Sequence, residues 1–219
     1  LDNNFILKIG EEEIDYEIKV IEGQAEVIVI SRENVFEDRK VFLENQFIFA
    51  DGAGAVVIGP SDHPGIGPTI WGSDADSRDA ILLEPSWNDV KNGAAGGAWP
   101  HLSQQGQTVF RWAVFSMSKA GLRALAAAHV RPDQLDAFIP HQANSRIIES
   151  MAREMKLPEK VVIAQDIRTS GNTSAASVPL AMAALLEEHP ELHGGLALLI
   201  GYGAGLVYAG QVVQLPPKP

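Results

Sequence analysis

The chain has 219 residues, of which 46% are hydrophobic and 21% charged, with a formal net charge of −11 and no cysteine. The negative charge argues against a nucleic-acid-binding surface, and the lack of cysteine excludes disulfides, thiolate metal sites and thiol nucleophiles within these residues. No apolar run has the length of a membrane span and no signal-peptide pattern is present, so we expect a cytoplasmic protein that binds neither nucleic acid nor membrane.

The acidic side chains are concentrated at the start of the chain. Residues 1–46 hold twelve acidic and five basic side chains, a net charge of −7, which leaves −4 for the remaining residues. We interpret this shift in composition as evidence that the two parts of the chain differ in origin.

The first predicted element is a β-hairpin over residues 5–21. Residues 5–9 are strand-like, residues 10–12 form a turn, and apolar and charged residues then alternate with a period of two from Ile14 to Val20. Such alternation predicts one buried and one solvent-facing side. An apolar run over residues 25–30 predicts a buried strand, and the charged residues 31–45 predict a loop or short helix.

The next segment is rich in turn-forming residues. Residues 47–58 predict two strands around a kink at residues 51–54, where glycine permits close approach of another backbone. A further strand is expected from Thr69 to Asp74. Residues 77–107 show no sustained periodicity, which predicts a long surface loop near the mouth of a site.

The second half of the chain alternates between helical and strand-like patterns. Apolar residues recur at helical spacing from Phe110 to Leu125, and this helix is expected to end near His129. Further helices are expected after Asn144 and over residues 178–186. Strands are expected at 135–140, 161–164, 196–200 and 206–213. This order predicts a five-stranded mixed sheet with helices on its faces.

Three short runs follow predicted strands of this second half. They are residues 139–144 (IPHQAN), residues 171–177 (GNTSAAS) and residues 201–205 (GYGAG). Ligands of open α/β sheets bind at the carboxyl ends of the strands. The pattern therefore predicts that His141, Asn172 and a glycine-rich turn meet at one edge of the sheet.

Together with residues 49–57, 65–69 and 109–113, these runs resemble the C-terminal half of β-ketoacyl-acyl-carrier-protein synthase III, a condensing enzyme. The resemblance covers about residues 47–215 and implies an α/β fold of the thiolase-like type. It divides the chain into three parts. They are an unmatched hairpin segment at 1–24, for which a grafted, a designed and a strongly diverged origin are the alternatives; residues 25–59, which resemble the last strands of the family's N-terminal half; and a complete C-terminal half at 60–219.

The resemblance also implies catalytic roles for His141 and Asn172. In the family, a histidine and an asparagine donate hydrogen bonds to the thioester carbonyl of malonyl-carrier protein, where negative charge develops as CO2 leaves. A neutral imidazole with a proton on Nε2 and an amide NH2 group both suit this task. A purely structural histidine is the alternative for His141 taken by itself.

Five further residues are implied at the site by resemblance. Tyr202, Gly203 and Ala204 match a loop that supplies a backbone N–H to a second oxyanion hole, and the same residues also suit a tight turn. Asn144 matches a pantetheine contact, with a helix N-cap as its alternative. Arg146 matches a basic residue near the carrier-protein phosphate, with a solvated helix position as its alternative.

No metal or resident cofactor is expected. The acidic clusters match neither a phosphate-binding loop nor a calcium-binding loop, and the remaining histidines lack metal-ligand spacing. Thioesters of coenzyme A or phosphopantetheine are expected as substrates. The histidines interpreted as surface residues are His63, His101, His129, His189 and His193.

The function implied by resemblance is initiation of fatty-acid synthesis, by condensation of an acyl-CoA primer with malonyl-acyl carrier protein. Acyl-CoA, acyl carrier protein and a second copy of the chain are the expected partners. The family attacks its acyl donor with a cysteine in its N-terminal half, and these residues contain none. We therefore predict negligible acyl transfer by this chain without another source of a nucleophile.

Three explanations remain open from the sequence. The chain is a chimera whose hairpin covers an exposed sheet, an enzyme half completed by another chain, or a relative that binds carrier protein or acyl groups without chemistry. The third explanation includes a scaffold with no reaction at all. An isolated half would expose a large apolar face, which predicts oligomerisation or a covering segment.

Overall fold

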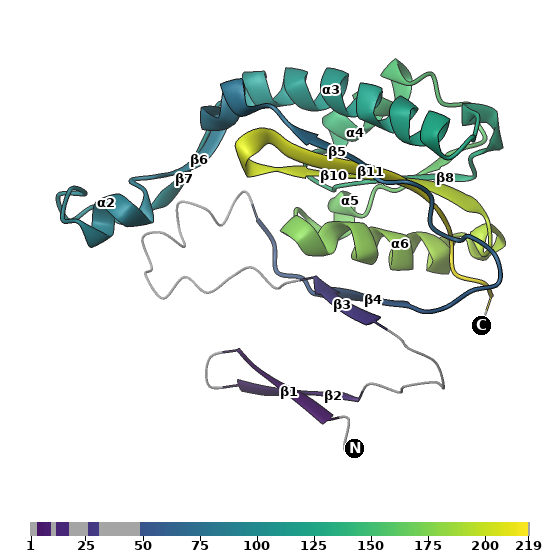
Figure 1. Cartoon of the computed structure of the whole chain (residues 1–219), viewed down its shortest axis with the longest axis horizontal. Coiled ribbons are helices and arrows are strands. Elements are labelled where there is room, and N and C mark those ends of the chain that lie inside the picture. The colour runs from purple at the N-terminus through teal and green to yellow at the C-terminus, as the bar shows by residue number, and fades with distance from the viewer. Residues whose placement is uncertain (1–3, 10–11, 18–25, 31–48, 219) are drawn as a thin grey trace.

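The computed structural model describes residues 4–9, 12–17, 26–30 and 49–218, and its side chains from residue 49 to residue 218 (Figure 1). Expectations for residues 10–11, 18–25 and 31–48, and for the burial of the first three strands, lie outside the described residues. The same holds for the proposal that the hairpin covers an apolar face.

A five-stranded mixed sheet forms the centre of the fold, as the sequence predicts. Its strand order is β5-β11-β10-β8-β9. β8 pairs in parallel with both β9 and β10, whereas β11 is antiparallel to its neighbours β10 and β5. The five strands are β5 (Ile70–Ser73), β8 (Ala137–Pro140), β9 (Val162–Ile163), β10 (Leu196–Gly203) and β11 (Val207–Gln214).

Helices cover both faces of this sheet. Figure 1 shows α3 (Gly106–Ala127) and α4 (Ser145–Glu154) on one face and α6 (Ser177–Glu188) on the other. The buried side chains accordingly form two clusters, one containing Met117 of α3 and Met151 of α4, the other containing Leu185 of α6. The helices expected from periodicity are thus confirmed.

Strand β8 is buried along its whole length because it lies between these two layers. Phe138 packs in the cluster beneath α3 and α4, while Ala137 and Ile139 pack in the cluster beneath α6. Alternate residues of a strand point to opposite faces. A continuous apolar strand is therefore what this position requires.

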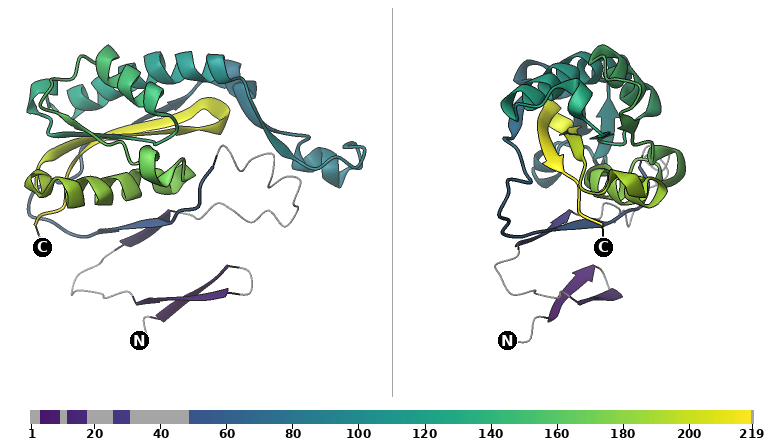
Figure 2. Two further views of the ribbon diagram at one scale, coloured as in Figure 1. Left: turned by 180° about the vertical axis from the view of Figure 1, so that it is seen from behind. Right: turned by 90° about the vertical axis from the view of Figure 1, so that its right-hand side faces the viewer.

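Residues 81–104 do not form the long loop that the sequence predicts. β6 (Ile81–Glu84) and β7 (His101–Gln104) pair as antiparallel strands, and α2 (Trp87–Lys91) lies between them. Figure 1 and the left view of Figure 2 show this arm extending beyond the layered body. Four-residue strands and a five-residue helix are too short for hydrophobic periodicity to reveal.

Local contacts hold the end of the arm together. The Ser86 side chain accepts a hydrogen bond from the Asp89 backbone N–H, and the Asp89 carboxylate accepts one from the Ser86 N–H. This reciprocal pair is a capping box, which supports a helix start. The indole rings of Trp87 and Trp99 lie edge to face with their centroids 5.5 Å apart.

The N-terminal strands form two separate pairs. β1 (Asn4–Ile9) and β2 (Glu12–Glu17) pair antiparallel, with Leu7 opposite Ile14, which confirms the predicted hairpin over these residues. β3 (Glu26–Ile30) pairs antiparallel with β4 (Gly54–Ile58). Residues 49–53 are not in a strand, so the strand expected before the kink is not seen in its described part.

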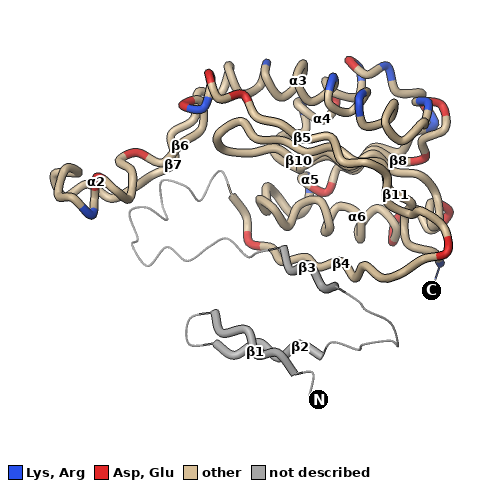
Figure 3. The backbone as a smooth tube through the Cα atoms, in the orientation of Figure 1, with Lys and Arg blue, Asp and Glu red and all other residues tan. Residues whose placement is uncertain are grey.

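Charge is distributed in keeping with these layers. Strands β5, β8, β9, β10 and β11 of the central sheet contain no charged residue, and Figure 3 shows the Lys, Arg, Asp and Glu positions of residues 49–218 on helices, turns, connecting segments and the β6–β7 arm, where Glu84 ends β6. Among the described residues, no helix is long and apolar enough to cross a bilayer.

Replacement of Phe138 tests the position of the core. Phe138 is fully buried, so Phe138→Ala removes its packing and leaves a cavity, and we expect a loss of about 3–5 kcal/mol in the free energy of unfolding. Phe115 of α3 is 51% exposed, and Phe115→Ala serves as the matched control with a much smaller expected loss. Urea denaturation of both variants measures the difference, and equal losses would contradict this assignment of the core.

Candidate active site

An open cavity of about 1900 Å³ lies at the ends of β8 and β10. Its walls also include residues of the β6–β7 arm, the first half of α3 and the starts of α4 and α6. All the site residues expected from the sequence line this single cavity, as the topology predicts. They are His141, Asn144, Arg146, Asn172, Tyr202, Gly203 and Ala204.

His141 follows the last residue of β8 and is held by three contacts. Its backbone N–H donates to the Ile200 carbonyl at 2.7 Å, which continues the pairing of β8 with β10. Its Nδ1 lies 2.6 Å from the Ser177 hydroxyl oxygen, and its ring lies edge to face against Tyr202 with centroids 5.2 Å apart. Burial lowers the pKa of His141 to about 4, so the imidazole is neutral at pH 7.

Asn172 lies in the loop that follows α5 (Ile167–Ser170). The chain turns through Gly171, whose φ of 71° is favourable for glycine. The Asn172 side-chain oxygen accepts a hydrogen bond from the Ser174 N–H at 3.0 Å. This contact fixes the orientation of the amide, because a backbone N–H needs an acceptor, and it leaves the NH2 group available to donate.

The glycine-rich kink at residues 51–54 supports the Asn172 loop. The Ala50 N–H donates to the Asn172 carbonyl at 2.8 Å. A Cβ atom at Gly52 would lie 2.7 Å from the Thr173 side chain, and one at Gly54 would lie 2.6 Å from Pro179. The close backbone approach predicted for this kink is therefore present, and the partner is the segment that carries Asn172.

Tyr202, Gly203 and Ala204 form the end of β10 and the start of the turn into β11. The turn passes through Gly205, whose φ of 69° is again favourable for glycine. The Tyr202 hydroxyl is buried and has no hydrogen-bond partner among the described residues. Burial also raises the pKa of this phenol, which therefore remains protonated.

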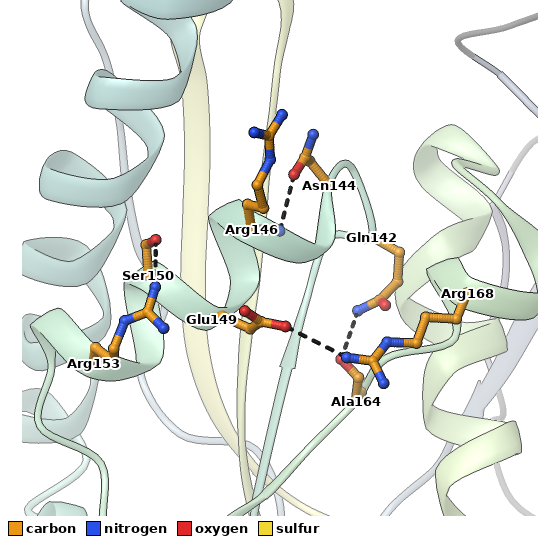
Figure 4. A network of polar contacts seen from close by, with 8 residues as sticks. All are labelled: Gln142, Asn144, Arg146, Glu149, Ser150, Arg153, Ala164 and Arg168. Carbon is orange, nitrogen blue, oxygen red and sulfur yellow. Dashed lines mark hydrogen bonds and ion pairs between the residues drawn. The ribbon is translucent and has the colours of Figure 1, made fainter.

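Asn144 and Arg146 begin helix α4 at the rim of the cavity (Figure 4). The Asn144 side-chain oxygen accepts a hydrogen bond from the Arg146 N–H at 2.9 Å, so Asn144 is the helix N-cap. Its amide NH2 has no partner in the described part of the chain. The Arg146 guanidinium is exposed and stands apart from the Arg168–Glu149 ion pair that Figure 4 also shows.

Sequence reasoning missed Gln142 and Ser177, which are both fully buried. The Gln142 amide nitrogen donates to the Pro140 carbonyl at 2.7 Å, and its side-chain oxygen accepts from the Ile167 N–H at 3.1 Å. Gln142 thus joins the end of β8 to the start of α5. The signal for both residues was their position inside two of the quoted runs, but sequence does not reveal which polar side chain of a run points inward.

Comparison with known protein sequences finds relatives for the part of the chain that forms this cavity. Residues 125–215 match the family model described as 3-oxoacyl-[acyl-carrier-protein] synthase III C terminal. The chain is 53% identical over 203 residues to a β-ketoacyl-[acyl-carrier-protein] synthase III of Streptomyces glaucescens, covering 90% of this chain and 60% of that protein. It is 55% identical over 173 residues to the mycobacterial synthase III of Mycobacterium avium, covering 79% and 51% respectively.

Solved structures of related condensing enzymes share the fold of this chain. The priming β-ketosynthase of the R1128 polyketide pathway superposes with a TM-score of 0.77 at 40% identity, covering 89% of this chain and 58% of that one. The synthase III of Pseudomonas aeruginosa PAO1 superposes with a TM-score of 0.69 at 31% identity, covering 83% and 54%. The resemblance to the C-terminal half of synthase III and the thiolase-like fold are therefore confirmed, and the chain spans between 51% and 60% of the length of these four relatives.

The contact between the kink and the Asn172 loop predicts a steric effect at Gly52. Gly52→Ala places a methyl group 2.7 Å from Thr173, and we expect a loss of about 1–3 kcal/mol in the free energy of unfolding. Gly59 has no heavy atom within 4 Å of such a methyl group, so Gly59→Ala is the control. Denaturation midpoints compare the two, and a Gly52→Ala variant as stable as Gly59→Ala would refute the contact.

The low pKa of His141 predicts a pH-dependent stability. The unfolded chain takes up a proton near pH 6.5, whereas the folded chain does so near pH 4, so stability is complete above pH 6.5 and falls as the pH is lowered towards 4. The pKa difference of His141 corresponds to about 3 kcal/mol of stability. We expect the free energy of unfolding of His141→Ala to depend less on pH, whereas that of His63→Ala, at an exposed position, should keep the wild-type dependence. Denaturation curves between pH 4 and pH 7 measure both. The same pH dependence in the two variants would contradict this prediction.

Proposed function

We propose that this chain carries the decarboxylation half of a β-ketoacyl-acyl-carrier-protein synthase III site. The reaction joins an acyl-CoA primer to malonyl-acyl carrier protein with loss of CO2. The observation that carries the proposal is the meeting of two neutral hydrogen-bond donors, the His141 imidazole and the Asn172 amide, at one cavity.

Neutral donors suit the chemistry of this step. When the malonyl carboxylate leaves as CO2, the electron pair of the broken C–C bond forms an enolate, and negative charge grows on the thioester oxygen. Two fixed donors stabilise that charge without moving at the moment of reaction. The enolate carbon then attacks the acyl carbonyl, which forms the new C–C bond and expels the thiolate that held the acyl group.

The rim of the cavity suits a carrier-bound thioester. Asn144 and Arg146 stand together at the start of α4, and Arg111 of α3 lines the same cavity. Guanidinium groups bind phosphate through several N–H donors at once. We propose that these residues receive the phosphopantetheine arm of acyl carrier protein or the corresponding part of coenzyme A.

Covalent acyl transfer requires a nucleophile, and these 219 residues include no cysteine that could serve as one. We propose that it comes from another segment or another chain, which would also close part of the open cavity. Apolar side chains support a further contact surface, since Trp71 is 75% exposed and Val57 is 72% exposed. A homo-oligomer is one way to cover them.

A binding module without chemistry is the second candidate. The rim of the cavity favours it, because the exposed Arg146 guanidinium and the Asn144 amide suit recognition of a phosphate-bearing thioester whether or not a reaction follows. In that case, substitution of Asn144 or Arg146 would weaken thioester binding. No CO2 release would be measured, so substitution of His141 or Asn172 could not reduce it.

The central test follows CO2 release and intact mass when the purified chain meets malonyl-acyl carrier protein and acyl-CoA. We expect CO2 without an acyl adduct, and a loss of about 10²–10³-fold in rate for His141→Ala and for Asn172→Ala, since each removes one donor. His63→Ala and Asn88→Ala, both at exposed positions, are the matched controls and should retain the wild-type rate.

Three outcomes would change this proposal. CO2 release that His141→Ala leaves unchanged would remove the assigned donor role. An acyl adduct on the chain would reveal a nucleophile other than cysteine. Carrier-protein binding that persists without CO2 release, and that weakens in Arg146→Ala, would favour the binding module.

A further inference from the structure

The Ser177 hydroxyl has two partners in the described part of the chain, and both belong to the segment that carries His141. The Gln142 backbone N–H donates to its oxygen at 3.2 Å, and the His141 Nδ1 lies 2.6 Å from the same oxygen. Ser177 is the first residue of α6, far from His141 in sequence, and it is fully buried. Water therefore does not compete for either contact.

Counting protons decides which atom donates to which. A backbone N–H can only donate, so the Ser177 oxygen is the acceptor from Gln142. The hydroxyl hydrogen then needs an acceptor, and Nδ1 of His141 is the remaining partner. If Nδ1 carried the proton instead, the oxygen would accept twice and the hydroxyl hydrogen would be buried without a partner, which is unfavourable.

We propose that Ser177 is a positioning residue that donates its hydroxyl proton to Nδ1 of His141 and thereby holds the imidazole as the Nε2–H tautomer. The Nε2–H group is then the donor that His141 offers to the cavity. This assignment deepens the proposed function and rests on it for its catalytic meaning, because only that tautomer can stabilise a developing oxyanion from this side of the ring.

The same contacts argue against Ser177 as a nucleophile, although a serine beside a histidine suggests one. A nucleophilic hydroxyl must reach the substrate carbonyl, whereas the Ser177 side chain is completely shielded from solvent and its hydroxyl is already engaged on both sides. Its contact with the imidazole is made through Nδ1, and no other polar contact of Nε2 is present among the described residues. Ser177 therefore orients the ring and leaves the chemistry to the opposite nitrogen.

The Gln142 N–H makes this arrangement specific. Without it, the hydroxyl could rotate and exchange donor and acceptor roles with Nδ1, so both tautomers would be populated. The buried Gln142 side chain in turn holds its own backbone through the Pro140 carbonyl and the Ile167 N–H. The tautomer of His141 is thus set by the junction of β8, α5 and α6.

Nitrogen NMR of the 15N-histidine-labelled chain tests the assignment without any substrate. The His141 signals are identified as those lost in His141→Ala. At neutral pH we expect a protonated Nε2 and an unprotonated Nδ1 in the wild-type chain. Ser177→Ala should convert part or all of the signal to the Nδ1–H form. Ser118→Ala, which removes another fully shielded serine hydroxyl that bonds the Val114 carbonyl, is the matched control and should leave the His141 signals unchanged.

The outcomes of the NMR experiment are decisive in both directions. A proton on Nδ1 of the wild-type chain would overturn the proposal, and so would a tautomer that is the same in Ser177→Ala as in the wild type. Thermal denaturation of both serine variants distinguishes a change of tautomer from partial unfolding. In a variant that unfolds, the chemical-shift dispersion of all signals would collapse. A change of tautomer moves only the His141 nitrogen signals and leaves the other signals dispersed.

The catalytic consequence is measured separately. CO2 release from malonyl-acyl carrier protein should fall about 10- to 100-fold in Ser177→Ala, by analogy with residues that orient a metal-binding histidine. It should stay unchanged in Ser118→Ala. An Nε2–H tautomer lost in Ser177→Ala without any loss of CO2 release would overturn the positioning role. If the wild-type chain releases no CO2, the proposed function fails while the NMR result still decides the tautomer.

Discussion

The candidate site depends on one buried junction, where polar side chains tie the end of β8 to the starts of α5 and α6. Gln142 bonds to Pro140 and to Ile167, and the Ser177 hydroxyl bonds to Gln142 and to His141. Buried polar groups are costly unless every donor and acceptor is paired. Because these contacts satisfy one another, the same bonds that stabilise the junction also fix the position of the His141 ring.

The surrounding packing keeps this junction rigid. β8 lies between two apolar layers and contributes Phe138 to one of them and Ile139 to the other. The second site residue, Asn172, is held differently, by a glycine turn and by the close approach of Gly52 to Thr173. One donor is thus placed by a core strand and the other by a loop supported from outside the sheet.

The electrostatics divide the cavity into a neutral interior and a basic rim. Burial holds the His141 imidazole in its uncharged form, so the interior offers an N–H donor without net charge, and the buried Tyr202 phenol beside it stays protonated. Arg146 and Arg111 lie on exposed helix surfaces at the border. This division suits a ligand with an anionic arm and a thioester that gains charge only during the reaction. The exposed Arg168–Glu149 ion pair lies outside this division and contributes little to the free energy of unfolding, because solvent screens both charges.

The sequence by itself determined the order along the chain of the five central strands and of helices α3, α4 and α6, the mixed sheet, and the three runs that meet at one cavity, because helical periodicity, strand ends and glycine turns are local signals. The tertiary structure was needed for the β6–β7 arm, whose elements are too short to show a period. It was needed also for Ser177 and Gln142, since only the fold shows which polar side chain of a run points inward. The contact between Gly52 and Thr173 also had to come from the structure, because the two residues are far apart in the sequence and no local pattern shows which distant residue a glycine approaches.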